Sequence, residues 1–121
     1  MTSPTDAPIA EAIPCTTAFD IPGFVIEKHV GLTWGVLVRS VGFAKGFTSG
    51  FKALKAGEVP QFTEVVDQTR RQALERLIEH AQSMGANAVI GIRFDSSDAG
   101  GDDQGLSEII AYGTAVVIKP A

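Results

Sequence analysis

A single run joins a helical pattern to a strand pattern in this 121-residue chain: Gly85-Ala-Asn-Ala-Val-Ile-Gly-Ile-Arg-Phe-Asp95. Before it, residues 63–84 carry apolar side chains at three- and four-residue spacing, which is typical of an amphipathic helix. Gly85 is a natural stop for that helix, and the apolar run after it favours a strand over 86–94. A long helix that leads directly into a strand indicates an α+β domain.

The predicted helix over 63–84 has recognisable end signals. Thr63 is a suitable N-cap, and Glu64 and Asp67 fall in the first turn, where acidic groups complement the helix dipole. Asp67 and Arg71 are spaced four residues apart, which predicts an ion pair on one helix face.

Strand patterns lie on both sides of this helix. Residues 19–30 and 36–41 are rich in β-prone side chains, and the glycine-bounded stretch 31–35 between them predicts a hairpin turn. Residues 95–105 are polar and predict a loop, and 107–119 predict the last strand. With a second helix over 42–56, the expected order is β-β-α-α-β-β. We therefore predict a small antiparallel or mixed four-stranded sheet backed by two helices.

Two sets of small residues predict close packing. A Gly-Phe pair recurs every four residues between 42 and 51, so on a helix the phenylalanines form a stripe beside a strip of glycines. One face of the last strand carries Ala111, Gly113 and Ala115, which favours close approach by a helix or a neighbouring subunit. A membrane-surface role for the stripe is the weaker alternative. We predict an oligomer interface formed by Gly42, Phe43, Gly46, Phe47, Gly50, Phe51, Ala111, Gly113 and Ala115.

Composition limits the classes of function. Residues 1–18 contain three prolines and no apolar period, which predicts a flexible tail before a single domain over 19–121. A net charge of −4 argues against nucleic-acid binding, which normally needs a basic surface. No secretory signal pattern or membrane-spanning apolar run is present, so we expect a cytoplasmic protein. A 45% hydrophobic content favours subunit contacts that cover apolar surface.

The run 85–95, the strand motif Gly113-Thr-Ala-Val116 and the Gly31/Gly35 pair together resemble the YbjQ-like family, also described as putative heavy-metal-binding. The resemblance extends over roughly residues 20–118. It implies a ring-shaped homo-oligomer, typically a pentamer, and raises the question of metal binding. The chain departs from the family pattern at four positions: Val36, Glu58, Val59 and Phe62.

The candidate transition-metal ligands are Cys15, His29 and His80. Soft metals prefer thiolate and imidazole, but no CxxC or HxxxH spacing occurs here. One subunit therefore lacks a ligand set, whereas a ring could offer one His29 from each subunit around its axis. We expect His80 on the polar face of its helix, near the C-terminal end.

Other chemistry finds little support in the residue patterns. The acidic stretch 95–103 lacks the EF-hand spacing, and residues 42–52 lack the ending of a phosphate-binding loop. No nucleophile has an identifiable base partner. We therefore expect a non-enzymatic, ring-forming structural or ligand-binding module. The alternative is a metal- or small-ligand-binding protein that uses symmetry-related residues at the ring axis.

Overall fold

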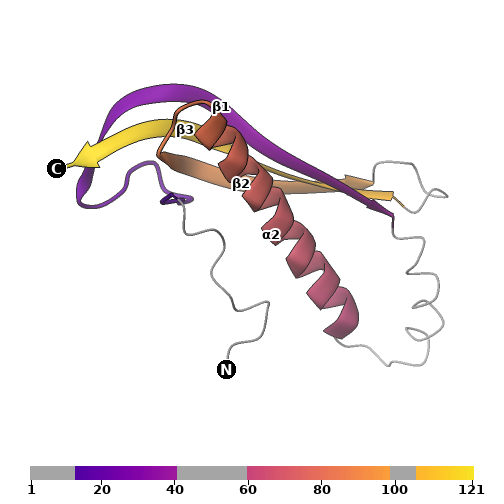
Figure 1. Ribbon diagram of the computed structural model, residues 1–121. Helices are drawn as coiled ribbons and strands as arrows, with labels where there is room; N and C mark the ends of the chain where they lie inside the picture. The colour runs from indigo at the N-terminus through magenta and orange to yellow at the C-terminus, as the bar shows by residue number, and fades with distance from the viewer. Residues whose placement is uncertain (1–12, 41–59, 99–105) are drawn as a thin grey trace.

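The structure is a computed structural model that describes residues 13–40, 60–98 and 106–121. Within these residues one helix packs on one side of a sheet of three strands (Figure 1). The sheet is antiparallel, with strand order β1-β3-β2. The elements are β1 (Phe24–Ser40), α2 (Pro60–Ser83), β2 (Ala88–Asp98) and β3 (Leu106–Pro120). The α+β class is confirmed, and the predicted second helix over 42–56 lies outside the described residues.

The predicted hairpin between 19–30 and 36–41 is wrong, because both stretches belong to the single strand β1. Its pairing with β3 runs from Phe24 opposite Pro120 to Ser40 opposite Leu106. Register shifts between Ile26 and Lys28 and between His29 and Gly31 mark β-bulges, which bend a strand without ending it. The glycines that resembled a turn therefore lie inside a long, bent strand.

The long helix is confirmed, with a shifted start. α2 begins at Pro60, a residue suited to a first helical position, so Thr63 is not its N-cap and Glu64 falls outside the first turn. Gly85 ends the helix as predicted: its φ is 87°, a left-handed conformation that favours glycine. The expected pair between Arg71 and Asp67 is present, with 2.8 Å between Nε and Oδ2.

The main core lies between α2 and the sheet. Ala73, Leu77 and Ala81 of the helix are fully buried. They belong to the same core cluster as Ala111 and Ala115 of β3, which are also fully buried. The small side chains of Ala111 and Ala115, which the sequence predicts at close contact with a helix or a neighbouring subunit, here let the chain's own helix approach. At Gly113 the close neighbour is the strand β2 instead, because a Cβ there would lie 2.9 Å from the Ile90 carbonyl oxygen.

The helix comes closest to the sheet at Gly35. A Cβ there would clash with the Ala73 carbonyl oxygen and would lie 2.5 Å from the Leu77 backbone nitrogen. Gly35 pairs with Ala111 across β1 and β3, so two small residues lie side by side beneath the helix. Figure 1 shows α2 lying obliquely to the strands, with its N-terminal end extending away from the sheet.

Residues 13–18, here called the N-terminal strap, run beside β2. Four backbone hydrogen bonds join the strap to residues 89–92 of β2, including Thr16 N–H to Val89 O at 3.1 Å and Gly91 N–H to Ala18 O at 2.8 Å. Cys15 and Val89 form a parallel β-bridge. The strap therefore packs as part of the fold, although composition placed it in a flexible tail; residues 1–12 lie outside the described residues.

β2 is also longer than its apolar pattern predicts. Asp95 to Asp98 were expected in a polar loop, but they pair with Ile110 to Ser107 of β3. Cross-strand hydrogen bonding has extended a strand through residues that carry no strand signal of their own.

Candidate functional site

The sheet face turned away from α2 carries exposed apolar side chains along β1. Leu32, Trp34 and Val38 are 62%, 46% and 51% exposed. They are separated by two and four residues, and such separations place side chains on the same face of a strand. Their partners on β3 are Thr114, Tyr112 and Glu108. We call these three β1 residues the apolar stripe. Isolated apolar side chains on a surface are ordinary, but a contiguous row marks an interaction surface.

Trp34 is anchored at the strand edge by His80 of α2. The Trp34 backbone N–H donates to His80 Nδ1 at 3.4 Å, and the two rings are 4.7 Å apart at a 60° angle. Next to it, the Thr33 hydroxyl donates to the Leu77 carbonyl oxygen at 2.9 Å, and its oxygen lies 3.1 Å from His80 Nδ1. These contacts connect the last turns of α2 to the middle of β1.

A hydroxyl next to an imidazole invites comparison with a nucleophile and its base. Thr33, however, is completely buried and its hydroxyl is engaged by a helix carbonyl group. A substrate cannot reach an atom in that position without displacing α2. The Thr33–His80 pair therefore serves as a helix-to-strand joint.

The outer edge of β1 is partly occupied by side chains of α2. Arg76 Nη1 donates to the Val36 carbonyl oxygen at 2.7 Å, and His80 accepts from Trp34 N–H two residues earlier. Proteins commonly cover the backbone groups of an edge strand to prevent another strand from pairing with it. In β1, the exposed face therefore offers a better contact surface than the strand edge at these residues.

The apolar stripe borders a polar strip on β2 and β3. The Tyr112 hydroxyl donates to Asp95 Oδ2 at 3.1 Å, and the Ser97 hydroxyl donates to Glu108 Oε2 at 3.4 Å. The hydrogen bond to Asp95, with the charge of that carboxylate, raises the pKa of Tyr112. This face therefore has an apolar side on β1 and a hydrogen-bonded polar side on β2.

The three predicted metal ligands are not brought together. Cys15 packs with the helix-side core and its thiol contacts the Ile13 carbonyl oxygen at 3.6 Å, while burial raises the pKa of the thiol. His29 is exposed and pairs with Val116 of β3. Val116 belongs to a second buried cluster, separate from the core that contains Cys15. His80 is the residue that anchors Trp34. Within residues 13–40, 60–98 and 106–121, no group of three or more His, Cys, Asp or Glu side chains could hold a metal.

Several positions in this region escape the sequence patterns. Trp34 and Gly35 fell in the expected turn, and Thr33 beside them carried no special signal. The burial of Thr33 on the helix side of β1 is what requires a partner for its hydroxyl, and that burial depends on the position of α2. The predicted interface residues of 42–51 lie outside the described residues. Within the described part of the chain, no helix is long and apolar enough to cross a membrane.

Comparison with known proteins identifies relatives over nearly the whole chain. Residues 13–119 match the sequence model of the YbjQ_1 family, described as "Putative heavy-metal-binding". A UPF0145 protein of Methanoregula boonei is 50% identical over 100 residues, which cover 83% of this chain and 81% of that protein. One from Sulfurisphaera tokodaii is 47% identical over 103 residues, which cover 85% and 88%.

A solved structure shares the fold. It is a protein of unknown function of the DUF74 family from Pediococcus pentosaceus, with a TM-score of 0.58 and 15% sequence identity. The match covers 88% of this chain and 98% of that one. At this level of identity the likeness concerns the fold alone.

Proposed function

The chain belongs to the YbjQ family of putative heavy-metal-binding proteins, and we propose that it acts as a non-enzymatic module whose working form is a homo-oligomeric ring. The observation that carries this proposal is the apolar stripe of Leu32, Trp34 and Val38 on the sheet face opposite α2. Burying that stripe against a second copy would remove apolar surface from water, which is the main driving force of subunit association. A ring of five subunits is the form that the family resemblance implies.

Two features support association through the sheet face. Arg76 and His80 cover backbone groups of the β1 edge, so they discourage pairing of strand to strand at those residues. The polar strip beside the stripe, with the Tyr112–Asp95 pair, supplies the polar rim that surrounds the apolar centre of a typical interface. The non-enzymatic part of the proposal is supported by the burial of Thr33, which keeps its hydroxyl away from any substrate.

Native mass spectrometry of a Leu32→Glu/Val38→Glu double variant tests the assembly. We expect the wild type to be a single oligomer, and the variant to be largely monomeric while its circular dichroism spectrum is retained. Both substituted side chains are already exposed, so the fold of each subunit should tolerate them. The control is Val25→Glu, which introduces the same charge at a 43% exposed valine of β1 outside the stripe and should leave the oligomer intact. A monomeric wild type, or an oligomeric double variant, would contradict the proposal.

The second candidate is a ligand shared between subunits, for which His29 is the residue available. Its imidazole is exposed, and the family description names heavy metals. The described residues of one subunit do not form a metal site, so such a site would need His29 from several copies. Metal analysis of protein from zinc-supplemented culture should then show metal in wild type and its loss in His29→Ala. Equal metal content in the two proteins would exclude this role for His29.

A further inference from the structure

An open pocket of about 170 Å³ lies on the other side of the molecule, between the N-terminal strap, α2 and β2. Its walls are mostly apolar, with Leu74 supplied by the helix and Ile92 and Phe94 by β2. The strap completes it with Cys15, Thr16 and Thr17. The pocket is therefore built from three segments that are far apart in the sequence, and it is separate from the apolar stripe of β1.

The strap wall of the pocket is held in position by side chains as well as by backbone pairing. Arg93 Nη1 donates to the Thr17 carbonyl oxygen at 2.9 Å, and its guanidinium carbon lies 5.7 Å from the centre of the Phe19 ring. The Phe19 ring packs over Gly91, where a Cβ would lie 2.9 Å from it. A wall fixed in this way gives the pocket a preformed shape, which lowers the entropic cost of binding.

A positive charge lies beside the apolar walls. The guanidinium carbon of Arg70 is 5.8 Å from the centre of the Phe94 ring. Arg70 precedes Leu74 by one helical turn, so both project toward the same side of α2. Within the described residues Arg70 has no acidic side chain in a salt bridge with it, so its charge is available to an anion.

We propose that this pocket binds a small carboxylic acid with an apolar chain of about six carbons, the chain lying against Leu74, Ile92 and Phe94 and the carboxylate facing Arg70. The size follows from the volume, since an apolar cavity of about 150 Å³ in another protein holds benzene. The charge of the ligand follows from Arg70. Cys15 forms part of the apolar wall, because a thiol in partly buried surroundings behaves as a small hydrophobic group. The site is complete within one subunit and does not depend on the proposed ring.

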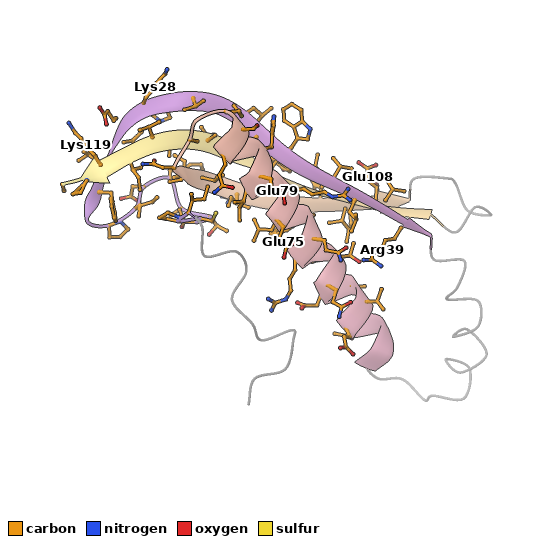
Figure 2. The ribbon with its side chains drawn as sticks, viewed as in Figure 1. Lys28, Arg39, Glu75, Glu79, Glu108 and Lys119 are labelled. Atoms are coloured by element: carbon orange, nitrogen blue, oxygen red, sulfur yellow. The ribbon has the colours of Figure 1, made fainter. Side chains whose placement is uncertain are left out.

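Titration of the full chain with hexanoate, followed by NMR, tests the site. We expect saturable shifts confined to signals of the strap, Leu74 and Phe94. Hexan-1-ol has a chain of the same length without the charge and should bind about fivefold more weakly, as should hexanoate to Arg70→Gln. Lys28→Gln removes one positive charge at the far end of the sheet (Figure 2) and should leave the affinity for hexanoate unchanged.

Other outcomes would overturn the proposal. Absence of saturable shifts at the pocket would exclude the site, and equal affinities for hexanoate and hexan-1-ol would exclude an anionic ligand class. Shifts centred on Leu32, Trp34 and Val38 would show adsorption to the apolar stripe instead. Leu74→Phe adds volume to the pocket wall, so undiminished hexanoate binding by this folded variant would place the ligand elsewhere. Loss of the oligomer in the stripe variants leaves the expected shifts in place, which separates this test from that of the ring.

Discussion

Alternate residues of β1 meet two different environments. Thr33, Gly35 and Leu37 lie beneath α2 and are buried, whereas Leu32, Trp34 and Val38 alternate with them along the strand and are about half exposed. Two members of the first set are small or hydrogen-bonded because a helix lies directly on them. The second set is bulky, and among the described residues its Trp34 reaches the strand edge, where the ring contacts His80 of α2. One strand therefore has a face that α2 covers and a face that is largely exposed, which the proposed assembly would bury.

The largest expected effect is that of Gly35→Val, which should disrupt the packing of β1 against α2. The new side chain would meet the backbone of α2 at Ala73 and Leu77, which cannot move aside as a flexible side chain can. We expect a loss of more than about 3 kcal/mol in the free energy of unfolding, measured by urea denaturation. Gly85→Ala is the control: nothing lies within 4 Å of its Cβ position, so it should cost only about 1 kcal/mol for its left-handed backbone. Equal losses in the two variants would contradict the close approach.

Alanine substitutions at two neighbouring residues of β1 compare the contributions of the two faces to stability. Leu37→Ala leaves a cavity under the helix and should lower the free energy of unfolding by about 2–5 kcal/mol. Val38→Ala, one residue later on the exposed face, should change it by less than about 1 kcal/mol under conditions in which the subunit is monomeric. The measurement is urea unfolding of both variants in the Leu32→Glu background. A larger effect at Val38 than at Leu37 would reverse the assignment of the faces.

Thr33→Val tests the joint between β1 and α2. The two side chains have similar shapes, so the variant removes the hydrogen bond to Leu77 and the contact with His80 while filling the same space. Thermal or urea unfolding should show a loss of about 1–2 kcal/mol. Thr114→Val, on the opposite face of β3, provides the matched substitution and should be close to neutral. A neutral Thr33→Val would show that the buried hydroxyl contributes nothing to the joint.

The smallest expected effect concerns the titration of Tyr112 on the exposed face. Its pKa is raised, chiefly by the hydrogen bond to Asp95, so Asp95→Asn should lower the pKa of the chain's single tyrosine. Because the folded-state pKa is the higher one, the contribution to stability is complete below the unfolded value near 10 and is lost as the pH rises through the folded value. Absorbance of tyrosinate against pH measures the shift. An unchanged or raised tyrosine pKa in Asp95→Asn would count against the pair.

The elements with their own periodicity could be predicted from the sequence. The helix before Gly85 and the strands around Ile90 and Val116 carry repeating apolar patterns, and all three are present. The stretch 31–35 was misassigned because glycine is a turn signal locally, whereas the role of Gly35 depends on a helix that begins 25 residues later at Pro60. Pairing of Asp95–Asp98 with β3 likewise depends on the partner strand.

The candidate surfaces were harder to predict than the fold. Ala111 and Ala115 were correctly expected to permit close approach, but the sequence left open whether a helix or another subunit would approach. Trp34 was hidden in the supposed turn, so its place in the apolar stripe emerged only from the pairing of β1 with β3. Cys15 was assigned to a tail because its partner, Val89, lies most of the chain away.

The N-terminal strap also has a consequence for the order of folding. The Thr16 N–H donates to the Val89 carbonyl oxygen, and Phe24 pairs with Pro120, so residues early in the chain need partners that are synthesised much later. α2 and the neighbouring strands β2 and β3 involve shorter separations and should form first, with β1 and the strap joining afterwards. Pulse-labelled hydrogen exchange would then show late protection of Gly91 N–H, which donates to Ala18 of the strap. The strap would thus close the pocket last, against walls of α2 and β2 that are already in place.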